Sequence, residues 1–205
     1  PDLGTALDRQ TGVIMVLRLF GQEDEAKLLT DEQANAKLAK FTDAGTIADW
    51  SKKQVAYAVD KGIVKGYEDS TFKPAAALNG KAYSSLLLQQ LGYNGDFDYH
   101  QAAVKLSQIG GLTASQAAVF NTDAGIIKDS LVGISYGALQ AKYKADGVKL
   151  IKALIASQNV KEEDAKAAGI AYADIKSVAA IANVTVDIGA TPTLPATVTA
   201  TFDNA

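Results

Sequence analysis

One stretch of the chain, residues 41–93, constrains the possible fold more than any other. Its first part is patterned as a helix that begins near Trp50 and stops at Gly62. A turn rich in Gly, Asp and Ser follows, and then Pro74, a residue that cannot sit inside a helix without cost. A second helical segment follows the proline and ends at Gly92. The stretch therefore predicts a complete unit of two helices joined by an ordered turn.

Part of the same unit recurs before this stretch. Residues 1–21 align with the second helical segment without a gap, because Leu7 and Leu78 are 71 residues apart and so are Gly21 and Gly92. We expect residues 1–21 to be the second half of an earlier copy whose first half is missing. Repetition of this kind indicates units that bury their apolar faces against one another.

A more divergent copy and the helix that follows it are expected over residues 94–160. Trp50 pairs with Tyr99 at an offset of 49 residues, whereas Leu78 pairs with Ile134 at an offset of 56. The change of seven predicts a seven-residue insertion in the loop between the two helices of this copy. In this alignment the second helix begins at Ser135.

The remaining segments connect or extend these units. Residues 22–40 are rich in helix formers and predict one solvated connecting helix. A further helix is expected from residue 147 as far as residue 169. Residues 161–182 are interpreted as a linker. Residues 183–205 alternate β-branched and small residues, which is typical of strands. They resemble the opening strands of a bacterial immunoglobulin-like domain that is cut short.

Composition excludes several classes of protein and site. The net charge of −3, without a basic run, argues against a nucleic-acid partner. No apolar run is long enough to span a membrane. The chain has one His and no Cys, so a Cys–His nucleophile pair is impossible and a zinc site improbable. We therefore expect neither an enzyme nor a cofactor.

The stretch from residue 41 to residue 93 strongly resembles a surface-layer homology (SLH) repeat. The matching positions are Phe41, Asp43, Trp50, Ala58, Gly62, Ile63, Gly66, Tyr67, Asp69, Phe72, Pro74, Leu91 and Gly92. The resemblance implies a mainly α-helical fold, with tandem repeats around a pseudo-threefold axis and here a short β-rich C-terminal extension. It also implies an extracellular protein of the cell wall or S-layer.

In the SLH family the second helix opens with a Thr-Arg-Ala-Glu motif. A cation in the first turn opposes the helix dipole, so an anionic partner would account for it better. The family's ligand, a secondary cell wall polymer with pyruvate ketals, is such a partner. Here the first copy keeps a cap and the cation as Asp8-Arg9, and the second has Asn79-Gly80-Lys81. The third, Ser135-Tyr136, has a cap and no cation.

The family's binding grooves lie between neighbouring repeats, and the resemblance implies two candidates here. The first joins Arg9 to Trp50, with Gly66 and Tyr67 as neighbours. The alternative is that Arg9 forms a surface salt bridge and Trp50 anchors the core. The second joins Lys81 to Tyr99, with His100 as a possible helper. A third groove, at Tyr136, is not expected to bind.

These observations lead to two hypotheses. The first is non-covalent anchoring of an exported surface protein to a pyruvylated wall polysaccharide, with other S-layer subunits as further partners. The second is a degenerate SLH module that makes structural protein–protein contacts in a surface lattice and binds no glycan.

Overall fold

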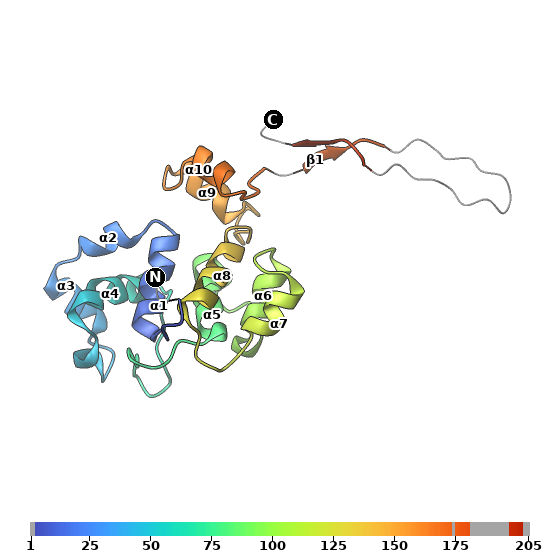
Figure 1. Ribbon diagram of the computed structural model, residues 1–205. Helices are drawn as coiled ribbons and strands as arrows, with labels where there is room; N and C mark the ends of the chain where they lie inside the picture. The colour runs from blue at the N-terminus through green and yellow to red at the C-terminus, as the bar shows by residue number, and fades with distance from the viewer. Residues whose placement is uncertain (1–2, 174, 181–196, 203–205) are drawn as a thin grey trace, which may run out of the picture. The chain divides into compact units, whose positions relative to one another are not determined.

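The computed structural model describes residues 3–173, 175–180 and 197–202, and the chain divides into two units, residues 1–162 and 163–205 (Figure 1). The described residues are mainly helical, which confirms the predicted mainly α class. The α-helices are α1 (Arg9–Leu19), α2 (Glu23–Lys27), α3 (Asp31–Leu38), α4 (Lys52–Asp60), α5 (Gly80–Gln90), α6 (Ala102–Gln108), α7 (Ala114–Phe120), α8 (Lys128–Ala138), α9 (Leu150–Ala156) and α10 (Glu162–Ala167). Short 3-10 helices span Ala44–Thr46, Asp49–Ser51 and Tyr99–Gln101, and the strands are β1 (Ile175–Val178) and β2 (Ala200–Phe202).

A closed ring of three backbone hydrogen bonds lies at the centre of the first unit. The Leu78 amide donates to the Leu7 carbonyl at 2.9 Å, and the Leu7 amide donates to the Ile126 carbonyl at 3.2 Å. The Ile126 amide closes the ring by donating to the Leu78 carbonyl at 2.7 Å. All three side chains are buried. Each residue precedes a helix by two positions, so the ring brings the starts of α1, α5 and α8 together (Figure 1).

The ring also corrects the predicted alignment of the third copy. The counterpart of Leu78 is Ile126 and not Ile134, because α5 begins at Gly80 and α8 begins 48 residues later, at Lys128. The predicted seven-residue insertion is wrong. The second helix starts 20 residues after the first ends in both copies, from Asp60 to Gly80 and from Gln108 to Lys128.

The misalignment has a physical cause at the start of α8. The expected N-cap, Ser135, lies inside this helix, and its hydroxyl is 2.7 Å from that of Tyr83. The actual N-cap is Ile127, which makes no side-chain capping bond. In contrast, Asp8 and Asn79 cap α1 and α5 as predicted, through bonds from the Thr11 and Ala82 amides.

The other helices pack around these three. Helix α4 contacts α1, and α3 contacts α4. Helix α6 contacts α5, and α7 contacts α6. The apolar faces of the two covering helices are small and fully buried, with Val55, Ala56 and Ala58 on α4 and Ala102, Ala103 and Leu106 on α6.

The turn between α4 and α5 is held by one carboxylate. Asp43 accepts the backbone amide hydrogens of Phe72 at 2.8 Å and of Lys73 at 2.7 Å. Phe72 is fully buried, and its ring centroid lies 5.8 Å from that of Phe41. Gly66 has φ of 84°, and a Cβ there would lie 2.3 Å from the Phe41 ring. Only glycine fits this position, because it combines a left-handed backbone with close approach to a ring.

Two predicted helices are each divided in two. The segment 22–40 forms α2 and α3, because Thr30 starts a new helix with a capping box to Gln33. The segment 147–169 forms α9 and α10, and Gln158 lies between them with φ of 62°.

The second unit contains the two strands. Strand β1 pairs with β2 in antiparallel orientation. β1 lies in the segment predicted as a linker, and β2 lies in the segment predicted to be immunoglobulin-like. Most of that predicted segment, residues 183–196 and 203–205, is outside the described residues. Within the described part of the chain, no helix has both the length and the apolar character needed to cross a membrane.

We expect Asp43→Ala to lower the free energy of unfolding by about 1–3 kcal/mol, since the part-buried amide of Phe72 and the exposed amide of Lys73 would lose a charged acceptor. Urea denaturation followed by circular dichroism measures this. Asp24→Ala is the control, because the Asp24 side chain is 96% exposed and pairs only with Lys27; it should change stability by less than about 0.5 kcal/mol. Equal effects of the two variants would contradict the role of Asp43.

Candidate ligand-binding pocket

A pocket of about 800 Å³ opens between segments from all three copies. This volume is in the range of small-molecule sites, roughly 300–1,000 Å³. The start of α1, the turn after α4, one face of α5 and the segment before α6 contribute its lining. The lining residues are Arg9, Ile63, Val64, Lys65, Gly66, Tyr67, Glu68, Asp69, Lys73, Ala82, Ser85, Leu86, Gln89, Gly95, Phe97 and Tyr99.

Arg9 is the first residue of α1, and no carboxylate in the part of the chain that the structure describes neutralises its charge. Its guanidinium carbon lies 4.8 Å from the ring centroid of Tyr67 and 5.3 Å from that of Phe72. These cation–π contacts position the side chain. The Nε atom is buried and has no hydrogen-bond partner, and no carboxylate of the described residues forms an ion pair with it. A buried donor without a partner is costly, and the guanidinium to which this atom belongs lines the pocket.

Gln89 supplies the complementary group in the same pocket. Its Oε1 atom is also buried and also lacks a hydrogen-bond partner. The pocket therefore holds one orphaned donor, on Arg9, and one orphaned acceptor, on Gln89. A ligand in this pocket would meet the guanidinium of Arg9 and the amide of Gln89, groups that can bind an anionic acceptor and a hydroxyl.

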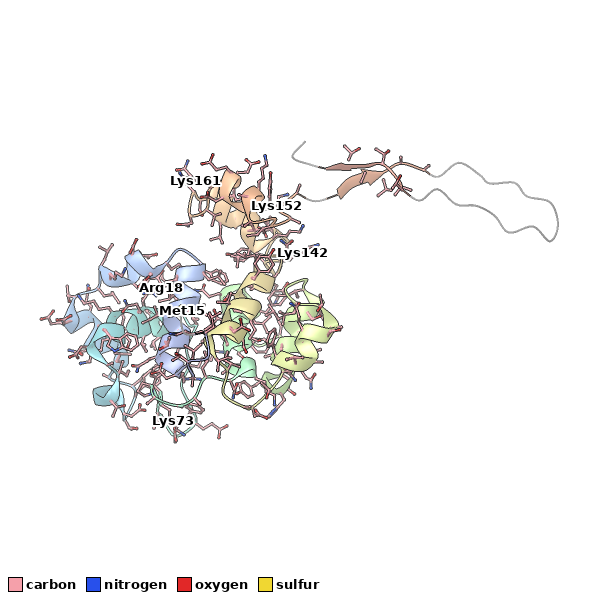
Figure 2. The ribbon with its side chains drawn as sticks, viewed as in Figure 1. Met15, Arg18, Lys73, Lys142, Lys152 and Lys161 are labelled. Atoms are coloured by element: carbon pink, nitrogen blue, oxygen red, sulfur yellow. The ribbon has the colours of Figure 1, made fainter. Side chains whose placement is uncertain are left out.

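Tyr67 lies in contact with two cations. The Lys73 ammonium is 4.4 Å from its ring centroid and forms an ion pair of 3.0 Å with Asp69 (Lys73 is labelled in Figure 2). The Thr71 hydroxyl, followed by Lys73, lowers the pKa of Asp69 to about 2. Since Asp69 neutralises Lys73, Arg9 is the cation of this cluster that is left for a ligand.

Aromatic side chains form the far wall of the pocket. Phe97 and Tyr99 come from the segment that leads into α6. The Tyr99 hydroxyl donates to the Oδ1 atom of Asn79, the N-cap of α5, at 3.2 Å. This bond ties the wall to the helix that carries Gln89. Aromatic rings beside polar groups suit the apolar face of a sugar.

The structure brings four of the six predicted site residues together. Arg9, Gly66, Tyr67 and Tyr99 all line the pocket. Trp50 does not line it; its side chain is 57% exposed, at the 3-10 helix before α4. Of the two aligned aromatic residues Trp50 and Tyr99, it is therefore Tyr99, from the third copy, that shares a pocket with Arg9.

Lys81 also lies outside the pocket. It is buried, and its ammonium forms an ion pair of 2.6 Å with Asp123. At the neighbouring Gly80, which aligns with Arg9, an added Cβ would lie only 1.9 Å from the Phe120 carbonyl oxygen. Phe120 backbone thus fills the space that an Arg side chain would need in the second copy. His100 is exposed and does not line the pocket.

Gln89, Phe97 and Lys128 were missed at the sequence level. Gln89 lies on one helical face with Ala82 and Ser85, and the sequence shows this spacing. The sequence does not show that this face lines a pocket. Lys128, the first residue of α8, occupies in the third copy the position of Arg9. Because the sequence predicted that this helix begins at Ser135, Lys128 was not recognised as its first residue.

Comparison with known proteins identifies one part of the chain. Residues 40–80 match the family model of the S-layer homology domain. The matched range includes Trp50, Gly66 and Tyr67 and leaves out Arg9 and Tyr99. No curated protein and no solved structure matches the chain. The match supports a cell-surface protein that contains an SLH domain, a domain that generally anchors proteins to secondary cell-wall polymers.

Gly80→Ala should destabilise the fold by about 1–3 kcal/mol, because the new methyl group would overlap the Phe120 carbonyl. This would occur although alanine favours helices over glycine by about 1 kcal/mol. Thermal unfolding measures the change. Gly45→Ala is the matched control, since an added Cβ there meets no atom within 4 Å, and a neutral result at Gly80 would contradict the closed second groove.

The depressed pKa of Asp69 gives a pH prediction. Because its folded-state pKa of about 2 is below the usual value of about 4, Asp69 stabilises the fold above pH 4. This contribution is lost as the pH falls from 4 toward 2. NMR titration of the Asp69 carboxyl should show the low pKa, and Thr71→Val should raise it. If the Asp69 carboxyl of the unmodified protein titrates near pH 4, this prediction is wrong.

Proposed function

We propose that this chain anchors an exported surface protein non-covalently to the bacterial cell wall, in an S-layer context. It does so by binding a pyruvylated secondary cell wall polysaccharide in the Arg9 pocket. The observation that carries the proposal is the Arg9 guanidinium, which lines the pocket and forms no ion pair with a carboxylate of the described residues.

The ligand's chemistry fits the two orphaned atoms. A pyruvate ketal carries a carboxylate, and a guanidinium can donate two parallel hydrogen bonds to such a group. A sugar hydroxyl can donate to the orphaned acceptor of Gln89. The rings of Phe97 and Tyr99 offer a surface to the next sugar along the polymer. Arg9 thus selects for charge, and Gln89 selects for a donor nearby.

We also propose that the three copies follow a pseudo-threefold arrangement in which one groove is functional. The repeated hydrogen bond among Leu7, Leu78 and Ile126 supports the arrangement. The neutralised Lys81 and the space filled by Phe120 support a single groove. A single groove at Arg9 would also allow the chain to bind although the other copies have lost the motif arginine.

The alternative is a structural module that contacts other proteins and binds no glycan. The closed second groove favours it, because one of the grooves suggested by the sequence is lost. Wall material stripped of its accessory polymer separates the two functions: retention of the protein on stripped walls supports the alternative.

Titration against the purified polymer tests the proposal. Arg9→Ala and Gln89→Leu should each weaken binding about 10- to 100-fold, since each removes a partner of a buried hydrogen bond to the ligand. Depyruvylated polymer should bind the unmodified protein weakly and should be insensitive to Arg9→Ala. Arg18→Ala is the matched control, because Arg18 is also on α1 but pairs with Glu23 at 2.6 Å. Unchanged binding by Arg9→Ala removes Arg9 from the site.

A further inference from the structure

Three lysines gather around Tyr93, just beyond the end of α5. The ammonium of Lys105, on α6, lies 5.2 Å from the centroid of the Tyr93 ring. The Tyr93 hydroxyl donates to the backbone carbonyl of Lys142 at 3.1 Å (Lys142 is labelled in Figure 2). The backbone amide of Lys144 donates to the carbonyl of Leu91 at 2.9 Å. We call Lys105, Lys142 and Lys144 the Tyr93 cluster.

The positive charge of the Tyr93 cluster is neutralised only in part among the described residues. Lys144 forms an ion pair with Asp96. Lys105 and Lys142 form no ion pair with a carboxylate in the part of the chain that the structure describes. Lys149 lies directly opposite Lys142 in an antiparallel backbone bridge, and like charges at opposed positions repel each other. The cluster is therefore a basic surface on a chain whose net charge is −3, and it suits an anionic partner.

A single turn separates the Tyr93 cluster from the Arg9 pocket. The turn spans residues 93–96 and is closed by a 3.1 Å hydrogen bond from the Asp96 amide to the Tyr93 carbonyl. Gly95, inside the turn, lines the pocket, whereas the side chains of Tyr93 and Asp96 contact the lysines. A Cβ added at Gly95 would meet no atom within 4 Å, so the surface there is open. A ligand longer than the pocket can therefore leave it over Gly95 and reach the Tyr93 cluster.

The two sets of cations suit separate acidic groups on one ligand. Arg9 lines the pocket itself, whereas the Tyr93 cluster does not line it. A sugar chain with a single ketal, held by Arg9, would bring no carboxylate to the cluster. A polymer with a ketal on every repeat would bring further carboxylates along the same chain, and these would meet Lys105 and Lys142.

We propose that the Tyr93 cluster binds carboxylates on the repeats next to the one that Arg9 holds, an inference that rests on the proposed function. The ligand is then a polyanion with an acidic group on successive repeats, and not a chain that is acidic at one end alone. Lys105 and Lys142 are the residues that set this specificity. Attraction between exposed charges is modest and is screened by salt, so the cluster adds to the affinity of the pocket without replacing it.

Calorimetric titration of the full chain with two ligands tests the role of the cluster: the purified polymer and a pyruvylated fragment of one repeat. The double variant Lys105→Gln with Lys142→Gln should weaken binding of the polymer about 3- to 20-fold, since two exposed charge contacts are lost. Binding of the fragment should not change. Raising the salt concentration from about 0.05 M to about 0.5 M should remove most of the difference between the variant and the unmodified protein.

Two further variants separate charge at this place from net charge and from folding. Lys61→Gln removes one charge, and the Lys61 ammonium also lies 5.2 Å from a tyrosine ring, that of Tyr57. However, Lys61 pairs with Glu25 at 3.7 Å and does not line the pocket, so this variant should bind the polymer normally. Lys105→Arg keeps the charge and should bind the polymer like the unmodified protein.

The outcome with Arg9→Ala distinguishes a failure of the cluster from a failure of the pocket. If Arg9→Ala weakens binding of both ligands and the double variant binds the polymer normally, the role of the cluster is refuted and the proposed function stands. If Arg9→Ala changes neither, the proposed function fails, and the role of the cluster fails with it. If the double variant also weakens binding of depyruvylated polymer, the lysines do not recognise the ketal carboxylates, and their proposed role is wrong.

Discussion

The first unit depends on the ring of three backbone hydrogen bonds among Leu7, Leu78 and Ile126. Each bond joins residues far apart in sequence, so the ring fixes the starts of three helices against one another. A buried backbone amide or carbonyl must find a partner, and here each copy supplies the partner for the next. The three side chains fill the space around the ring. The covering helices and the turn at Asp43 are then built outward from this centre.

The same repeated geometry produces three different surfaces. In the first copy Arg9 extends into an open pocket with two orphaned polar atoms. In the second, Gly80 replaces it and Phe120 closes the space. In the third, Lys128 is the first residue of α8, on which Val132 and Tyr136 are exposed. One scaffold thus gives the first residue of each central helix a different environment: Arg9 lines a pocket, Gly80 meets the Phe120 carbonyl, and Lys128 lies near an exposed helix face.

Sequence reasoning was reliable where local chemistry marks a helix boundary. Asp8 and Asn79 are good N-caps, Gly21 and Gly92 follow the helix ends, and α1 and α5 lie where they were predicted. It failed at α8, since Ile127 offers no capping signal and Ser135 gives a false one. The pairing of Arg9 with Trp50 failed for another reason. Which aromatic residue meets Arg9 depends on how the copies close around the ring, and that order is not local.

The sequence by itself therefore determined α1 and α5, their N-caps, the turn that requires Gly66, and a cation at the first position of α1. These follow from short-range sterics and hydrogen bonding. Only the tertiary structure decided that Arg9 has no ion-pair partner among the described residues while Lys81 is neutralised by Asp123, and that Gln89 and Tyr99 line the same pocket as Arg9. Those outcomes depend on contacts between residues distant along the chain, which packing selects and no local pattern encodes.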